Sequence, residues 1–138
     1  MNDRQTKTLH VVAAVIIRNG KVLCLQKGSS KYDYLSFKYE FPGGKIEAGE
    51  SEVTALAREI REELKIDIDV HEKLLSVDHE YPDFRISLHA YQCSSRADAI
   101  GLTEHINYQW LSVDELPDLD WAAADIPIVK ELKAGLST

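Results

Sequence analysis

The sequence predicts an α+β domain in which a mixed β-sheet is sandwiched between helices (α/β/α). Three observations predict this class. Two pairs of apolar segments are each joined by a short turn, which is typical of β-hairpins. A long amphipathic segment separates the pairs, and a second one lies near the end of the sequence. At 138 residues the chain fits one domain with its own core, so we expect a single domain over residues 1–138.

The first hairpin is predicted from Leu9–Ile17 and Val22–Gln26. Both segments are rich in β-branched residues, and Asn19-Gly20 between them is a strong hairpin signal. The first segment is apolar almost throughout. This indicates a strand that is buried on both faces, in the centre of the sheet.

A polar loop is predicted over Gly28–Ser36, with Tyr32 and Tyr34 inside it. From the sequence it is equally well interpreted as a connector or as a lid over a ligand. Lys38–Phe41 then has the composition of a short strand, and it leads into a loop with several glycines over Phe41–Gly49.

The main helix is predicted to begin after Ser51, a preferred N-cap residue. Its apolar residues recur at steps of three and four and form one stripe: Val53, Leu56, Ala57, Ile60 and Leu64. The same spacing puts Glu59, Glu62 and Glu63 on one flank near the C-terminal end. There they repel one another and are disfavoured by the helix dipole. This pattern fits two interpretations. One is a charged helix face exposed to solvent, which is the commoner case for a segment rich in charged residues, and the other is a cation site.

A divalent cation would make this cluster of carboxylates favourable. Mg²⁺ prefers oxygen ligands and is usually shared between a few carboxylates and the phosphates of a substrate. Gly43 and Gly44 allow the backbone to come close, so that a carbonyl oxygen can be a further ligand. The net charge of −7, from 23 acidic and 16 basic side chains, argues against binding of a nucleic acid polymer. Such an acidic protein needs metal ions to hold a polyphosphate.

The second hairpin is predicted from Ile66–Tyr81 and Phe84–Ser94, on either side of Pro82-Asp83. Apolar and polar residues alternate in the second of these segments. Three histidines lie in the two segments: His71, His79 and His89. They lack the spacing of metal ligands and are interpreted as ordinary strand residues.

The remaining elements are shorter. After a loop over residues 96–103, a strand is predicted at His105–Leu111, and the Ser-x-x-Glu pattern that starts at Ser112 predicts a short helical turn. The last helix is expected to have Asp125 as its N-cap and Pro127 in its first turn. Its apolar face is predicted to comprise Ile128, Val129 and Leu132.

Several classes of protein are disfavoured by composition. Cys24 and Cys93 lie far apart in apolar segments, so we expect reduced, buried thiols. No apolar run approaches the roughly 20 residues that span a bilayer, and the polar Met1–Thr8 lacks a signal-peptide core. We therefore expect a cytoplasmic protein without a membrane partner.

The spacing around the main helix resembles the signature of the Nudix hydrolases, G-x5-E-x7-R-E-U-x-E-E-x-G-U. The matching positions are Gly44, Glu50, Arg58-Glu59-Ile60, Glu62-Glu63 and Ile66. Only Lys65 departs from it, at the place of the final glycine. That glycine ends the helix in a left-handed conformation, so Lys65 should be mildly strained there, although its charge suits a helix C-terminus.

The resemblance extends to the MutT-like branch, including its CTP pyrophosphohydrolase type, through Glu40–Lys45, Tyr81–Asp83 and Ala124–Pro127. It implies the Nudix fold and an enzyme that uses Mg²⁺, or Mn²⁺, to hydrolyse a nucleoside triphosphate to a monophosphate and pyrophosphate. The implied substrates are 8-oxo-dGTP or CTP and dCTP, in nucleotide-pool sanitation, DNA repair or salvage. The alternatives are a nucleotide-sugar (ADP-ribose) pyrophosphohydrolase and a non-catalytic nucleotide-binding domain. Both a monomer and a homodimer are compatible with the sequence.

The resemblance also implies roles for individual residues. The implied metal ligands are Gly44, Glu59, Glu62, Glu63 and Glu104. The four glutamates among them are also the implied catalytic residues. The implied substrate contacts are Lys27, Lys45, Tyr81 and Asp125. Glu104 is included because it stands six residues before Trp110, where this branch places a fourth carboxylate. An ionised Asp125 only accepts hydrogen bonds, which would favour an exocyclic amino group of cytosine or guanine. Glu50, which also suits the N-terminal end of the helix as an anion, is expected to pair with Arg58 or brace the loop as structural support.

Overall fold

The computed structural model describes residues 7–135, and the ends of the expected 1–138 domain lie outside this range. The first half contains β1 (Thr8–Arg18), β2 (Lys21–Lys27), β3 (Tyr39–Glu40), β4 (Gly43–Lys45) and α1 (Glu52–Leu64). The second half contains β5 (Asp69–Glu80), β6 (Arg85–Ser94), β7 (His105–Ser112), the 3₁₀ helices η1 (Val113–Asp118) and η2 (Ala123–Asp125), and α2 (Ile126–Gly135).

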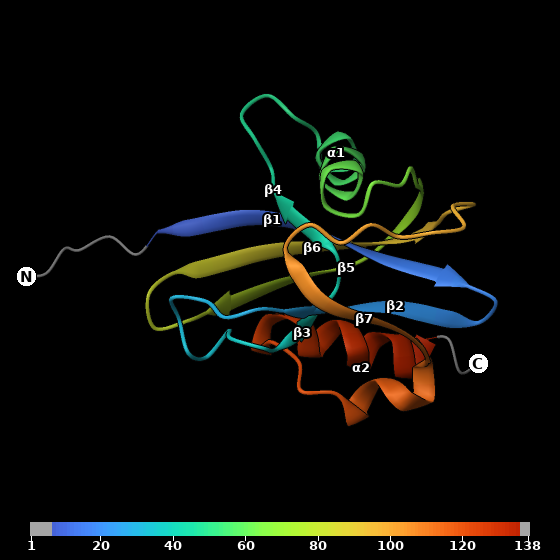
Figure 1. Ribbon diagram of the computed structural model, residues 1–138. Coiled ribbons are helices and arrows are strands. Elements are labelled where there is room, and N and C mark those ends of the chain that lie inside the picture. Colours follow the sequence, from blue (N-terminus) through green and yellow to red (C-terminus); the bar gives the residue numbers. More distant parts are fainter. Residues whose placement is uncertain (1–6, 136–138) are drawn as a thin grey trace, which may run out of the picture.

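The strands form one mixed sheet with the order β3-β2-β1-β6-β5, in which β4 also pairs with β1 and β7 with β2. β1 runs parallel to β6 and antiparallel to β2 and β4. The two α-helices lie on opposite sides of this sheet (Figure 1). The predicted sheet between helices is therefore confirmed. No described helix is long and apolar enough to cross a membrane.

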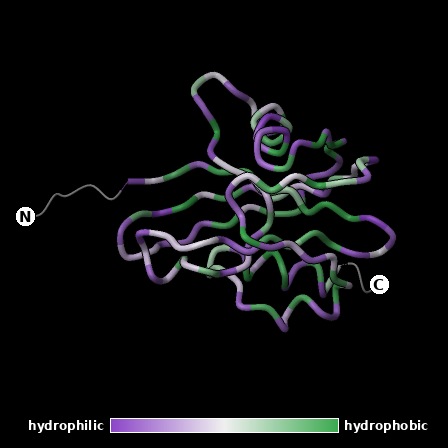
Figure 2. The backbone as a smooth tube through the Cα atoms, viewed as in Figure 1, coloured by the Kyte–Doolittle hydropathy of each residue, from purple (hydrophilic) through white to green (hydrophobic). Residues whose placement is uncertain are grey.

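β1 separates two hydrophobic cores, as expected for a strand buried on both faces. Val12, Ala14 and Ile16 pack in the core of α1, whereas Ala13 and Val15 pack in the core of α2. The helices contribute Ala55, Leu56, Ile60 and Leu64 to the first core and Ile128, Val129 and Leu132 to the second. Full burial of each such Leu or Ile stabilises the fold by about 1.5–3 kcal/mol. The strands in the centre of the molecule accordingly carry much of its hydrophobic sequence (Figure 2).

Both ends of α1 have the expected caps. The Ser51 hydroxyl accepts a hydrogen bond from the Thr54 N–H at 3.1 Å. At the other end Lys65 is left-handed, with φ 60° and ψ 35°, and its N–H bonds the Arg61 carbonyl at 3.1 Å. The signature position therefore keeps the conformation of the missing glycine. Val53 was wrongly placed in the apolar stripe: it lies in the first turn and is 45% exposed, and Ala55 is buried instead.

The hairpins are confirmed, with shifted bounds. Asn19 and Gly20 form the first turn, both with positive φ, and β5 begins at Asp69 instead of Ile66. The expected loop over Phe41–Gly49 contains β4, which sequence reasoning missed. Gly43 in β4 lies opposite Ala13, so close to β1 that an added Cβ would overlap the Val12 carbonyl. Both cysteines are buried free thiols, as expected.

Candidate functional site

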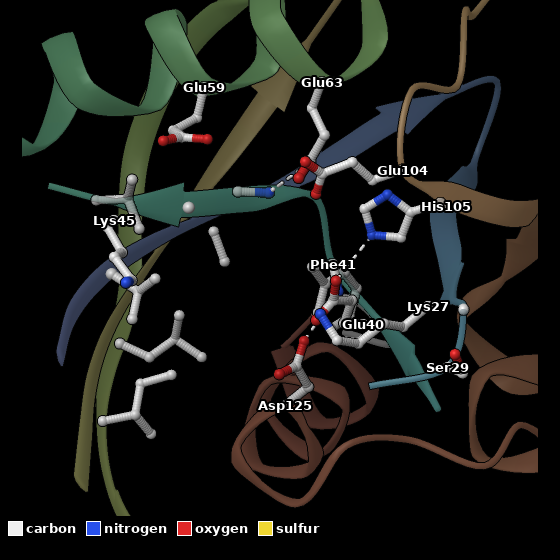
Figure 3. A pocket seen from close by; sticks show the side chains of 18 residues that line it. Lys27, Ser29, Glu40, Phe41, Lys45, Glu59, Glu63, Glu104, His105 and Asp125 are labelled. Carbon is white, nitrogen blue, oxygen red and sulfur yellow. Dashed lines mark hydrogen bonds and ion pairs between the residues drawn. The ribbon is translucent and has the colours of Figure 1, made fainter. Parts of the chain in front are cut away.

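A cavity of about 450 Å³ opens between α1, the β3–β4 segment, the start of β7 and Asp125. Figure 3 shows the carboxyl groups of Glu59 and Glu63 beside α1, with Asp125 at the opposite end. Lys27 and Ser29 lie on a third side and Lys45 on the fourth. The apolar side chains of Val11, Ile86 and Leu88 also line the cavity. The cavity therefore has an acidic end next to α1 and a more apolar end next to Asp125.

Glu63 is the most enclosed of the α1 carboxylates. Its Oε1 accepts a hydrogen bond from the Gly43 N–H at 3.2 Å. Burial, with the charges of Glu40 and Glu59 nearby, raises the pKa of Glu63 to about 7. The positive charge of His105 opposes this shift but does not cancel it, and a bound cation would favour the ionised form further.

Glu59 lies directly against the backbone of β4. A Cβ at Gly44 would overlap the Glu59 carboxyl group and would therefore displace it. Burial raises the pKa of Glu59, although the hydrogen bond from Arg58 opposes that shift. Gly44 and Glu59 thus bring a backbone segment and a carboxylate to one point on the cavity wall.

Arg58 holds the loop before α1 against the helix. Its Nε and Nη2 bond the two carboxylate oxygens of Glu50 at 2.6 and 2.9 Å, which confirms the expected pair. Nη2 also donates to the Lys45 carbonyl at 3.1 Å, and Nη1 donates to Glu59 at 3.1 Å. The bond from Arg58 is the first cause of the depressed pKa of Glu50, at about 2. These contacts fix Glu59 and the loop relative to each other.

The five residues implied as metal ligands do not all line the cavity. Gly44, Glu59, Glu63 and Glu104 do. The side chain of Glu62 is 61% exposed and is drawn towards Arg58, with Nη1 to Oε1 at 3.2 Å. The periodicity put Glu62 on the correct flank, but it could not show that Arg58 competes for this carboxylate.

The four implied substrate contacts are also divided. Lys27, Lys45 and Asp125 line the cavity, but Tyr81 does not. Tyr81 is buried, its hydroxyl accepts the Ala124 N–H at 2.9 Å, and its ring stacks on that of Tyr34. In this position Tyr81 supports the turn that carries Asp125 instead of facing the cavity.

Two expectations for Asp125 need correction. It is not the N-cap of α2: it lies in η2, and its Oδ2 accepts the Phe41 N–H at 2.8 Å. Burial and the nearby Glu40 charge raise the pKa of Asp125 well above its ordinary value. The neutral form, which both donates and accepts hydrogen bonds, is therefore favoured. This shift opposes the ionised form of Asp125, on which the expected contact with an exocyclic amino group depends.

The loop with Tyr32 and Tyr34 is fastened at its outer end. The two rings stack at 5.2 Å, and the Tyr34 hydroxyl donates to Asp83 in the turn between β5 and β6 at 2.8 Å. Only the beginning of the loop, at Gly28 and Ser29, lines the cavity. The structure thus shows this loop as an anchored connector.

Sequence reasoning missed two residues of the site, Glu40 and His105. His105 Nε2 lies 2.8 Å from Glu40 Oε2, and both residues line the cavity. Burial alone would lower the pKa of His105, but the bond to Glu40 and the charges of Glu40 and Glu63 raise it overall. Glu40 begins the Glu40–Lys45 segment that resembles the MutT-like branch, and His105 directly follows Glu104. Neither position reveals in the sequence that the two residues meet.

The donors around the acidic end fit a divalent metal ion shared with a ligand. They are hard oxygens, from Glu59, Glu63, Glu104 and the backbone at Gly44, and burial makes the Glu63 carboxylate costly to ionise without a cation. Within residues 7–135 no group of three or more His, Cys, Asp or Glu side chains could hold a metal ion by itself. Such an ion would need water and phosphate oxygens as further ligands.

Comparison with known proteins gives consistent matches. Residues 8–132 match the family described as the NUDIX domain. The chain is 38% identical to a CTP pyrophosphohydrolase from Escherichia coli (strain K12), over 93% of each protein. It is 33% identical to a putative 8-oxo-dGTP diphosphatase 2 from Mycobacterium tuberculosis (strain ATCC 25618 / H37Rv), over 92% of this chain and 89% of that one. The chain is also similar to a solution structure of MutT from methicillin-resistant Staphylococcus aureus 252, with 43% sequence identity and a TM-score of 0.75. The match covers 95% of this chain and 100% of that one.

Proposed function

This chain belongs to the Nudix family, and from that premise we propose that it is a MutT-type nucleoside triphosphate pyrophosphohydrolase. It is a hydrolase that acts on phosphoric anhydride bonds. The products we propose are a nucleoside monophosphate and pyrophosphate. The substrates suggested by its relatives are CTP-like nucleotides and 8-oxo-dGTP, in nucleotide-pool sanitation or salvage.

The observation that carries this proposal is the division of the cavity into two chemically different ends. The acidic end, with Glu59 and Glu63 near Lys45, suits a polyphosphate bound through cations. The other end, with an apolar wall and the buried carboxyl group of Asp125, suits a nucleobase. A triphosphate nucleotide contains both parts, in the order in which the cavity presents them.

Divalent metal is general in this family, and we propose Mg²⁺, with Mn²⁺ as a substitute, held by Glu59, Glu63 and the Gly44 carbonyl, with Glu104 as a further ligand. When bound, the metal neutralises phosphate charge and activates water. Arg58 keeps Glu59 in place, and the Gly43 N–H does the same for Glu63. Lys45 offers a positive charge to phosphate oxygens, and Glu104 is also placed to accept a proton from water. Glu62 lies outside the cavity, and its role is to pair with Arg58, which in turn holds Glu59.

Incubation of the protein with a panel of nucleotides and Mg²⁺, followed by identification of the products, tests this function. We expect a monophosphate and pyrophosphate from at least one triphosphate. Glu63→Gln should lower turnover by about 10²-fold or more, since it removes a ligand of the metal. Formation of AMP and ribose 5-phosphate from ADP-ribose alone would instead identify a nucleotide-sugar hydrolase. Nucleotide binding without turnover would identify a non-catalytic domain.

A further inference from the structure

The contact between His105 and Glu40 depends on an irregularity of the sheet. Gln26 of β2 lies opposite Asn107 of β7, but the next residue, Lys27, lies opposite His105, so Ile106 is an extra residue in β7. Such a β-bulge changes the face to which the following side chain points. Without it, His105 would share the face of Asn107 by simple alternation.

The two faces of this part of the sheet differ in chemistry. Asn107 and Gln109 donate hydrogen bonds to the Tyr39 hydroxyl, so these three side chains share one face. Glu40 follows Tyr39 in β3 and therefore points to the opposite face, which is the cavity face. The bulge thus brings His105 across to the face of Glu40.

The imidazole of His105 is held there at a cost. Its side chain is only 4% exposed, and its Nδ1 is buried without a hydrogen-bond partner among the described residues. Buried polar atoms are rarely left unpaired, because the folded state does not replace the hydrogen bonds that they make to water. A residue that serves packing alone would be better replaced by an apolar ring. The other nitrogen, Nε2, makes the bond to Glu40 at 2.8 Å.

Glu40 itself is partly open to the cavity. Its side chain is 29% exposed, its Oε2 is bonded to His105, and its Oε1 has no hydrogen bond to a described residue. The adjacent Phe41 N–H bonds Asp125, and the Gly43 N–H bonds Glu63. Glu40 therefore stands in the segment that links the two ends of the cavity, where the nucleoside part of a nucleotide would meet its phosphates.

Resting on the function proposed above, we propose that His105 is a positioning residue that fixes Glu40 as a hydrogen-bond acceptor for the nucleoside, and that this pair sets nucleotide selectivity. The group recognised is a hydrogen-bond donor of the nucleoside. It is either an exocyclic amino group of the base or a hydroxyl group of the sugar. Both present an N–H or O–H to the free Glu40 oxygen, and the experiment below separates them.

Binding of CMP, UMP and dCMP, measured by calorimetry without metal, tests the pair separately from catalysis. CMP and UMP differ in the base amino group, and CMP and dCMP differ in the 2′-hydroxyl. Loss of a hydrogen bond to a charged acceptor should raise the Kd for the preferred monophosphate about tenfold or more. Glu40→Gln and His105→Phe should both remove the preference between the members of one of these pairs. His105→Gln, which keeps a donor near the position of Nε2, should restore most of it.

The double variant Glu40→Gln/His105→Phe should bind no more weakly than either single variant, because His105 acts through Glu40. His71→Phe is the matched control, since His71 is exposed on β5, bonds Ser94 and lies outside the cavity. Melting temperatures show whether each variant is folded. Unchanged selectivity in folded His105→Phe would overturn the proposal. An equal rise of the Kd values for CMP, UMP and dCMP would also overturn it. So would a rise of the Kd in the double variant that equals the product of the rises in the two single variants. Absence of turnover in the unsubstituted protein would refute the enzymatic function but leave these binding results to decide this proposal.

Discussion

The carboxyl group of Glu59 occupies the space that a side chain at Gly44 would need, because a Cβ built at Gly44 would overlap it. This relationship explains why the signature begins with a glycine fifteen residues before Glu59. The glycine leaves room for the Glu59 carboxylate at the cavity wall, and any other residue would displace it. The two residues therefore act as one unit.

Gly44→Ala should abolish most activity with little change in stability. The added methyl group pushes the Glu59 carboxylate away from its position, and a displacement of about 1 Å at a catalytic group can cost 10²-fold in rate. Turnover of the best nucleotide and the Tm measure the two effects. Gly135→Ala is the control, because a Cβ at that position meets nothing within 4 Å. Full activity in Gly44→Ala would show that the position of Glu59 is unimportant.

Arg58→Met should lower both activity and thermal stability. The substitution removes the paired bonds to Glu50 and the bonds to Glu59 and the Lys45 carbonyl. We expect kcat to fall roughly 10- to 100-fold, since Glu59 loses its orientation, and the Tm to fall by several degrees. Arg61→Met serves as the comparison, because Arg61 only pairs with Asp67 at the surface, where both side chains are at least 70% exposed. Equal behaviour of the two variants would contradict this role.

Much of the fold could be predicted because it depends on local chemistry. Asn19-Gly20 specified a turn, Ser51 specified a cap, and the steps of three and four specified α1. The strand β4 could not be predicted in this way, because Gly43 and Gly44 carry no side-chain pattern and pair with β1 through their backbone. Val53 shows a related limit of prediction from sequence. Periodicity gives the direction in which a side chain points, but it does not show whether the rest of the protein covers that part of the helix.

The candidate site was predictable only where it follows a helix. Spacing put Glu59 and Glu63 together, but Glu62 is withdrawn by Arg58, a competition that spacing does not reveal. The contact between Glu40 and His105 joins residues 65 positions apart and depends on a bulge at Ile106. The protonation of Asp125 depends on burial, which is a property of the folded chain. Long-range contacts and burial therefore account for the part that the sequence did not reveal.

Lys65→Gly should stabilise the protein slightly. Lys65 is left-handed, with φ 60°, and this conformation costs a residue with a Cβ about 1–2 kcal/mol. Loss of a positive charge at the helix C-terminus and the greater freedom of unfolded glycine offset part of this, so a net gain of about 0.5 kcal/mol is expected. Urea unfolding measures it. Lys65→Ala retains a Cβ and should give no gain, so that equal stabilisation by both changes would point to the charge instead of the backbone.

Glu63→Gln should stabilise the metal-free protein at alkaline pH but not at acidic pH. The pKa of Glu63 is about 7 in the folded protein, against 4.5 for an unperturbed glutamate. Its folded pKa is raised, so its favourable contribution is complete below pH 4.5 and is lost as the pH rises to 7 and beyond. The ionised, buried form then costs about 3 kcal/mol relative to the protonated one. Glutamine stays neutral at every pH, and its side-chain oxygen can still accept the Gly43 N–H.

The difference in unfolding free energy between Glu63→Gln and the unsubstituted protein, measured with a chelator at pH 4.5 and pH 8, isolates this group from other carboxylates that titrate. We expect the difference to favour the variant at pH 8 and to vanish near pH 4.5. Mg²⁺ should stabilise the unsubstituted protein at pH 8 more than the variant, because the cation compensates the charge that glutamine lacks. Glu62→Gln, at an exposed position, should show no such pH dependence. A difference that is the same at both pH values would mean that burial does not make the Glu63 carboxylate costly to ionise, and its role as a metal ligand would lose its electrostatic basis.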